Sequence, residues 1–142
     1  MRLVASGAVA IALLAGCGGS DTHSSGGAHR TGTTCSSVID HIMQGAKDYG
    51  ARDYAGGYNN ADRAVHLLAG CPDKRTKVGL SGAALSVRGW NEHHLAKGDS
   101  MADMRLAYAL LKTCIDDAGT PPEVLDLCTR TSGMDAQVTA GW

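Results

Sequence analysis

Apolar residues recur at every third or fourth position along most of the chain beyond residue 35, a spacing that is typical of amphipathic helices. In the first segment this stripe comprises Val38, Ile39, Ile42, Met43, Ala46 and Tyr49. A second stripe follows Asp53, a residue suited to capping a helix, and comprises Tyr54, Tyr58, Ala61, Val65 and Leu68. Gly50 ends the first helix, and Gly70 followed by Pro72 ends the second.

A third helix is predicted from about Lys74 to Lys97, and it carries two stripes. The stripe of larger residues comprises Leu80, Ala83, Val87, Trp90 and His94. One position earlier lies a row of small residues, namely Gly79, Gly82, Ser86 and Gly89. Because interior glycines destabilise a helix by ~1 kcal/mol each relative to alanine, such a row indicates close approach of something to that face. Three interpretations are open: a neighbouring helix, a break near Gly82, or a groove in which Gly79, Gly82, Gly89 and Trp90 contact a bound partner.

Two further helices are expected before the chain ends. Ser100 and Asp103 form a possible capping box for a stripe of Met101, Met104, Tyr108, Leu111 and Ile115. Thr120 and Pro121 open the last helix, whose inner side includes Leu125 and Cys128. Residues 134–142 show no periodicity and are expected to form a loose tail. No segment alternates with period two, so we predict an all-α domain of about five helices in antiparallel hairpins over residues 35–133.

The N-terminus carries Arg2 and then an uncharged run, Leu3 to Ala15, which is too short to span a bilayer. The motif Leu14-Ala15-Gly16-Cys17 follows at once. In this order of charge, apolar run, small residues and cysteine, the segment resembles the signal of bacterial lipoproteins; an ordinary secretory signal is the alternative. The resemblance implies that residues 1–16 are removed and that Cys17 is acylated. Residues 17–34, rich in Gly and Ser, would then form a flexible linker.

Four cysteines remain for the body, an even number that predicts two disulfides in an exported chain. Three pairings are possible. Antiparallel helices bring together residues equidistant from their turn, and the midpoints of 35 with 71 and of 114 with 128 fall at the predicted turns near residues 53 and 121. This arithmetic favours Cys35–Cys71 and Cys114–Cys128. A zinc site is disfavoured because no C-x₂-C pair is present.

Small residues in the helical hairpins resemble those of tetratricopeptide-like repeats. In the first hairpin these are Gly45, Gly57, Ala61 and Ala64, with Tyr54 at the bulky position. In the second, Ala102, Leu106 and Ala109 keep the same spacing. The resemblance covers about Val38 to Cys114, although Cys71 and Cys114 lie 43 residues apart rather than the usual 34. It implies a surface for a peptide or protein partner.

The 13 basic and 14 acidic residues give a net charge of −1, so no nucleic-acid partner is expected. No catalytic motif is present, and we expect no cofactor. The main hypothesis is a non-enzymatic lipoprotein of the cell envelope that binds an unidentified protein or peptide, as an adaptor, assembly factor or inhibitor. The alternative is a lipoprotein that binds a small ligand or a metal through the glycine-lined groove and through His41 and His66, which lie nearly symmetrically about the first turn.

Overall fold

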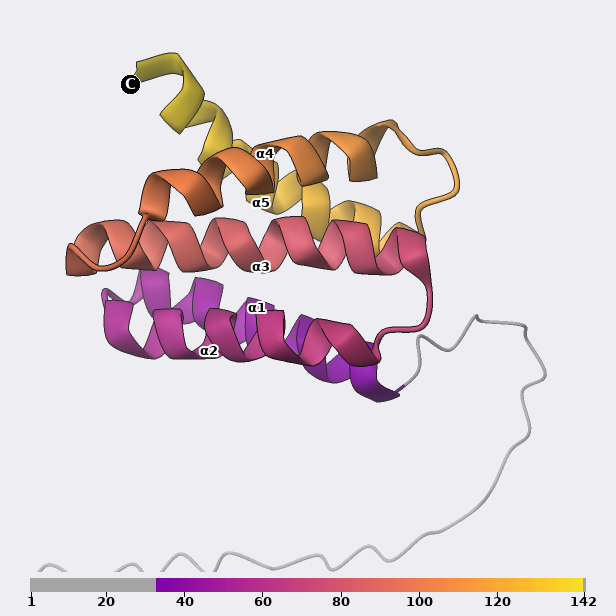
Figure 1. Cartoon of the computed structure of the whole chain (residues 1–142), viewed down its shortest axis with the longest axis horizontal. Coiled ribbons are helices and arrows are strands. Elements are labelled where there is room, and N and C mark those ends of the chain that lie inside the picture. Colours follow the sequence, from indigo (N-terminus) through magenta and orange to yellow (C-terminus); the bar gives the residue numbers. More distant parts are fainter. Residues whose placement is uncertain (1–32, 142) are drawn as a thin grey trace, which may run out of the picture.

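The computed structural model describes residues 33–141, with side chains from residue 35 to 133, and in this part the chain is helical without a strand (Figure 1). Its elements are α1 (Thr33–Gly50), α2 (Tyr54–Leu67), the short 3₁₀ helix η1 (Leu68–Gly70), α3 (Lys74–Leu95), α4 (Ser100–Asp116) and α5 (Pro122–Gly141). The predicted all-α class with five helices is therefore confirmed.

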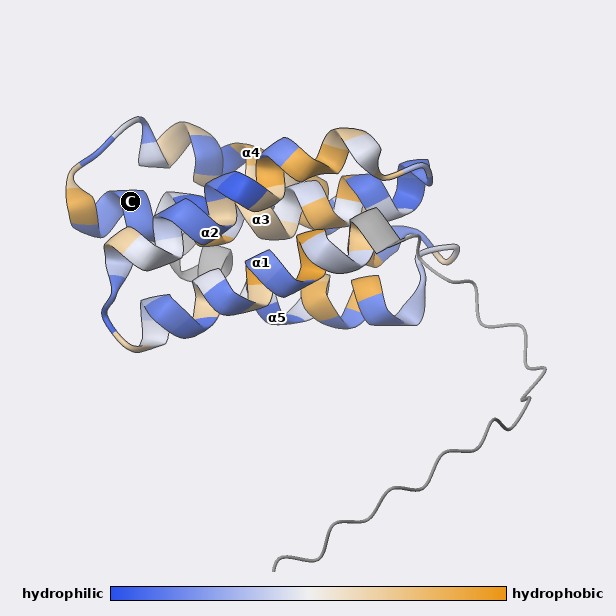
Figure 2. Cartoon of the chain, turned by 90° about the horizontal axis from the view of Figure 1, so that it is seen from below, coloured by the Kyte–Doolittle hydropathy of each residue, from blue (hydrophilic) through white to orange (hydrophobic). Residues whose placement is uncertain are grey.

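Helix α3 forms the centre of the bundle, with α1 and α2 against one side and α4 and α5 against the other (Figure 1). Because it is covered on both sides, 12 of its 22 residues are buried, including both of its predicted stripes as far as Gly89. The outer helices are amphipathic, and Figure 2 shows apolar and hydrophilic positions alternating along them.

The glycine row of α3 is the surface on which α4 and α5 pack. A Cβ atom on Gly79 would lie 2.5 Å from Val124 Cγ1, and one on Gly89 would lie 2.8 Å from Met104 Cγ. A Cβ on Gly82 would lie 3.0 Å from Leu111. The close-packing interpretation is confirmed, and α3 continues through Gly82 without a break. The groove interpretation is wrong, because this chain's own helices cover Gly79, Gly82 and Gly89.

This close approach also rotates α4 relative to the prediction. Its buried residues are Met104, Ala107, Leu111 and Cys114. Tyr108 and Ile115, which the apolar spacing placed inside, are 43% and 40% exposed. Met104 and Leu111 lie over Gly89 and Gly82, and Cys114 lies over Gly79, so the missing side chains of the glycines leave room for these inward-facing residues of α4.

The small residues of the repeat-like pattern differ between the two hairpins. Gly45, Gly57, Ala61 and Ala64 are buried in the first. A Cβ on Gly45 would lie 3.0 Å from the carbonyl oxygen of Gly57, so α1 and α2 pack closely here. Ala102, Leu106 and Ala109 lie on the exposed side of α4.

Both predicted disulfides are confirmed. Cys35 and Cys71 join the start of α1 to the end of the first hairpin, with their Cα atoms 5.3 Å apart. Cys114 and Cys128 join α4 to α5 with a Cα separation of 6.5 Å. Each bridge therefore closes one hairpin.

The helical body extends past both predicted boundaries. Helix α1 begins at Thr33, and α5 continues through residues 134–141, where the sequence predicts a loose tail. No proline follows Gly133 in the sequence, so the backbone hydrogen bonds of the helix can continue past this residue. Cys17 and the rest of residues 1–32 lie outside the described part, as does Trp142. Among the described helices, none combines the length and apolarity needed to cross a membrane.

Candidate binding site at one end of the bundle

Four helix termini meet at one end of the molecule: α1 and α3 end there, and α2 and α4 begin there (Figure 1). Asp53 caps α2 as predicted, its carboxylate accepting a hydrogen bond of 3.0 Å from the Gly56 amide. Arg52 takes up a left-handed conformation (φ 63°) that reverses the chain direction just before this cap. The tight turn places Tyr49, at the end of α1, beside Tyr54, at the start of α2.

Aromatic and imidazole rings from three helices are in contact at this end. We call Tyr49, Tyr54, Trp90, His93 and His94 the ring cluster. Tyr54 and His94 stack with centroids 4.2 Å apart and an angle of 8° between their planes. The Tyr49 hydroxyl lies 3.3 Å from Nε2 of His94, and its ring meets Trp90 edge-on at 6.3 Å. The rings of His93 and Trp90 meet edge to face, with their centroids 6.5 Å apart. The last turn of α3 therefore carries the rings that join it to the first hairpin.

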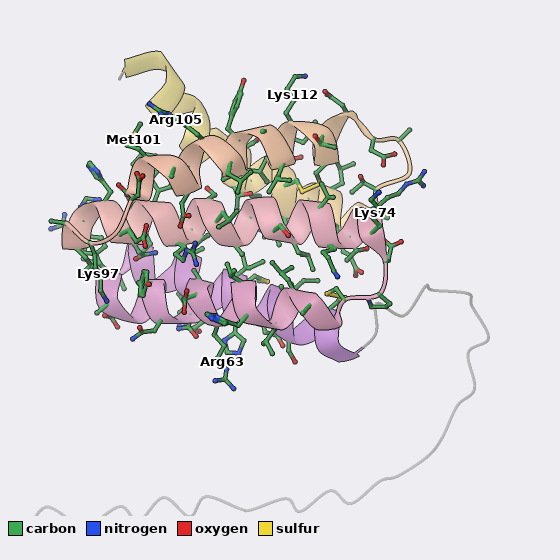
Figure 3. The ribbon with its side chains drawn as sticks, viewed as in Figure 1. Arg63, Lys74, Lys97, Met101, Arg105 and Lys112 are labelled. Carbon is green, nitrogen blue, oxygen red and sulfur yellow. A yellow bond between two sulfur atoms is a disulfide. The ribbon has the colours of Figure 1, made fainter. Side chains whose placement is uncertain are left out.

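The apolar core does not use these rings. It consists of aliphatic, alanine, methionine and cysteine side chains. Tyr58 also lies at this end, where the Nζ atom of Lys97 is 4.5 Å from the centroid of its ring; Figure 3 labels Lys97. Four of the five Tyr and Trp residues with described side chains are therefore at this end of the bundle. The ring cluster is half-buried in its Tyr and Trp members and exposed in its histidines. Most of the aromatic surface is therefore gathered at one place outside the core.

Burial raises the pKa of the Tyr49 hydroxyl, and the neighbouring Tyr54 adds to this shift. The Tyr49 hydroxyl can donate a hydrogen bond to Nε2 of His94. This contact and the stacking of Tyr54 together orient the ring of His94, which is an exposed residue.

A charged network lies behind the ring cluster and links α2, α3 and α4. Arg88 donates to Asp103 through Nε at 2.6 Å and Nη2 at 2.9 Å, and to Asp62 through Nη1 at 3.0 Å. The hydrogen bond to Asp103 is the main cause of the raised pKa of Arg88. Asp103, predicted as part of a capping box, therefore bridges helices instead, and Asp99 caps α4.

Glu92 lies next to this network and is only 7% exposed. Its Oε2 atom has no hydrogen-bond partner among the described residues. Burial is the main cause that raises the pKa of Glu92; the carboxylate of Asp103 adds to the shift and Arg88 opposes it. The turn after α3 lies against this carboxyl, because a Cβ on Gly98 would be 2.7 Å from Glu92 Oε1.

His41 and His66, the alternative metal ligands, are held by different partners. His41 Nδ1 lies 3.1 Å from Asn60 Oδ1, and His66 Nδ1 lies 2.8 Å from the Asp62 carbonyl oxygen. No group of three or more His, Cys, Asp or Glu side chains in the described part of the chain could hold a metal ion. The structure therefore places the two histidines in separate local contacts.

A hollow of about 280 Å³ lies at the opposite end, beside Lys74 and the Cys114–Cys128 bridge. Three ionisable residues line it, Lys74, Arg75 and Asp117, and Arg75 Nε pairs with Asp117 Oδ2 at 3.2 Å. This pair forms an ionic contact between the start of α3 and the α4–α5 turn.

Of the ring cluster, sequence analysis selected Trp90 as a partner-binding residue and placed Tyr49, Tyr54 and His94 on core stripes. A usable signal was present, because Tyr49 and Tyr54 flank one turn and residues 90–94 precede the next turn at the same end. Glu92 was not selected as a site residue from the sequence, although it lies two helical turns after the buried Leu85. Comparison of the chain with protein-family models, with curated proteins and with solved structures gave no match.

Proposed function

We propose that this chain is an exported bacterial lipoprotein, anchored through an acylated Cys17, whose helical body binds a protein or peptide partner at the ring cluster. The observation that carries the proposal is the gathering of aromatic and imidazole rings at one end of a bundle whose core needs none of them. The signal-like residues 1–17 supply the anchoring part of the proposal.

The chemistry of the ring cluster suits protein recognition. Tyr and Trp are enriched among residues that dominate binding energy at interfaces, because a large rigid ring loses little conformational entropy when it is covered. Here the rings are held in place by mutual stacking and by the Tyr49–His94 contact. A preorganised aromatic surface favours a partner that presents apolar or ring-bearing side chains of its own.

The position of the ring cluster suits an anchored protein. Helix α1 begins at one end of the bundle and ends at the ring cluster, so its 18 residues separate the two ends by ~27 Å. In Figure 3, Lys74 marks the end at which α1 begins and Lys97 the end with the rings. A body tethered through the residues before α1 would thus hold the ring cluster away from the point of attachment.

The two disulfides favour an oxidising compartment. The proposed location is therefore the cell envelope: the periplasmic face of the outer membrane in a bacterium with two membranes, or otherwise the outer face of the cell membrane. Two or more acyl chains on Cys17 would make this attachment stable, whereas one chain would give only marginal binding.

The anchor is tested by intact-mass measurement of the chain purified from its host's membranes. We expect a chain beginning at Cys17 that carries the mass of a diacylglyceryl group. A Cys17→Ser variant should lose this mass and leave the membrane fraction. An unmodified Cys17 in the native chain would contradict the anchoring part of the proposal and leave the binding part to be tested separately.

The binding surface is tested by placing a photocrosslinking amino acid at position 97 in the membrane-bound protein, with the same amino acid at Arg63 as the control. Arg63 points outward from α2, away from the rings (Figure 3). We expect a defined adduct from position 97 that disappears when Tyr54 and Trp90 are both replaced by Ala and persists when the exposed Tyr108 is replaced. Equal adducts from positions 97 and 63 would contradict a site at the ring cluster, provided that circular dichroism shows unchanged helicity.

A further inference from the structure

Charged groups on α2, on α3 and at the start of α4 act electrostatically on Glu92. Asp62 faces it from α2, Arg88 from the preceding turn of α3, and Asp99 and Asp103 from the start of α4. Three carboxylates therefore accompany a single cation around the Glu92 side chain. Ionised Glu92 would add a fourth negative charge to this group.

The one cation is already engaged. Arg88 directs three of its N–H groups to Asp103 and Asp62. Glu92 Oε2 has less than 1 Å² of accessible surface and accepts no hydrogen bond among the described residues. If Glu92 were ionised, this oxygen would carry negative charge while buried without a hydrogen-bond partner, which is unfavourable.

Of the cations that could bind the Glu92 carboxyl group, a proton fits these surroundings best. A metal ion would need further ligands, and the described residues offer no such group around it. A larger cation has no access to Oε2 of Glu92, because that atom is closed to water. A proton needs no additional space and removes the charge that the enclosure disfavours.

We propose that Glu92 is a proton-binding site that holds the turn between α3 and α4 closed, and that loss of its proton loosens this turn. Glu92 spans the turn with both of its polar ends. Its side chain lies beneath Gly98, and its backbone carbonyl accepts the Lys97 amide at 3.1 Å. Ionisation would repel Asp99 and Asp103, which follow the turn and begin α4.

The same turn of α3 carries His93 and His94. Resting on the proposed function, the inference is that proton binding at Glu92 regulates how firmly the ring cluster is presented to its partner. Burial, with the carboxylates of Asp103, Asp62 and Asp99, raises the pKa of Glu92 and so extends the pH range over which the closed turn persists.

The direct test is a ¹³C NMR titration of the full chain labelled at the glutamate carboxyl carbon. The sequence contains two glutamates, Glu92 and Glu123, so two resonances are expected, and a Glu123→Gln variant assigns them. We expect the Glu92 resonance to titrate with a midpoint above the ordinary value of 4.5. A midpoint at or below that value would overturn the proposal, whether or not Cys17 is acylated or a partner binds.

The effect on the turn is tested by amide hydrogen exchange in the same sample. Ala96 and Lys97 donate to the carbonyls of the last turn of α3, so their protection reports whether the turn is closed. We expect their protection to fall as the pH rises through the Glu92 midpoint in the native chain and to stay constant in Glu92→Gln, while Glu123→Gln behaves like the native chain. Protection that is independent of pH in all three proteins would overturn the proposed latch.

Discussion

Gly79 and Gly133 both lie inside helices, yet their surroundings are opposite. The space where a Gly79 side chain would be is occupied by Val124 and by the sulfur atoms of Cys114 and Cys128, all within 3.0 Å. The corresponding space at Gly133 is open. Helices generally favour alanine over glycine. At Gly79 the crowded surroundings outweigh this preference, whereas at Gly133 nothing opposes it.

We predict that Gly79→Ala destabilises the protein by about 2 kcal/mol, because a disulfide and a neighbouring helix must move to admit one methyl group. Gly133→Ala should stabilise it by ~0.5 kcal/mol, because it only reduces the entropy lost on forming α5. Urea unfolding of the two variants measures both values. A stabilising Gly79→Ala would show that α4 and α5 pack less closely than described.

Glu92 makes stability depend on pH in a defined direction. Its pKa is raised in the folded state, so below about pH 4.5 both folded and unfolded chains carry the proton and nothing is lost. As the pH rises, the unfolded chain releases its proton first, and stability falls until the pH passes the folded pKa. We predict that Glu92→Gln equals the native chain in stability below pH 4.5 and exceeds it by an amount that grows with pH until the folded pKa of Glu92 is passed, measured by urea unfolding at several pH values. Glu123→Gln, on an exposed side chain, should show no such growing difference.

At the scale of elements, the helices pack through two kinds of contact. Small residues let α3 approach α4 and α5 closely, whereas Arg88 ties α2 to α4 by ion pairs over the surface of α3. The second contact was not predictable from helical periodicity, because Asp62, Arg88 and Asp103 are 15 or more residues apart and each fits a solvated helix face. Only the relative rotation of the three helices brings them together.

We predict that Arg88→Gln destabilises the protein by about 2 kcal/mol, because Asp103 and Asp62 are left beside Glu92 without a cation in a half-buried site. Arg88→Lys should lose less, since lysine keeps the charge but cannot form the two-pronged contact with Asp103. Arg63→Gln on the exposed side of α2 is the control and should change stability by less than ~0.5 kcal/mol. Thermal and urea unfolding would contradict the assignment if Arg88→Gln and Arg63→Gln behaved alike.

At the scale of the whole molecule, two cross-links brace a body whose core contains few large side chains. The Cys35–Cys71 bridge closes a loop with a sequence separation of 36, and the Cys114–Cys128 bridge closes one with a separation of 14. Because the larger loop restricts the unfolded chain more, the two bridges should differ in their contribution.

We predict that replacing Cys35 and Cys71 together by Ala destabilises the protein by ~4 kcal/mol, and that replacing Cys114 and Cys128 does so by ~3 kcal/mol. The shorter bridge also packs against Gly79, so its loss leaves a gap in the core. Unfolding midpoints of the two double variants, with and without reductant, measure the difference. Reductant should have no further effect on a variant that lacks both bridges.

The sequence by itself determined the helices, their antiparallel hairpins and the pairing of the cysteines. All three follow from distances along the chain: a period of three to four residues, a turn-forming residue, and equal spacing on either side of a turn. The close packing behind the glycine row was also foreseeable as one of three interpretations. These features depend on residues that are near in the sequence, or on pairs of residues that lie equally far from a single turn.

The tertiary structure alone decided which side of α4 faces inward, how Tyr49 and Tyr54 meet the last turn of α3, and that Glu92 is enclosed. Each of these depends on the rotation and separation of helices that are distant along the chain. A row of small residues permits another helix to approach closely but does not specify which helix does so. The candidate site therefore depends on packing. Its rings come from three helices, and the spacing of residues within one helix does not show how that helix is placed against the other two.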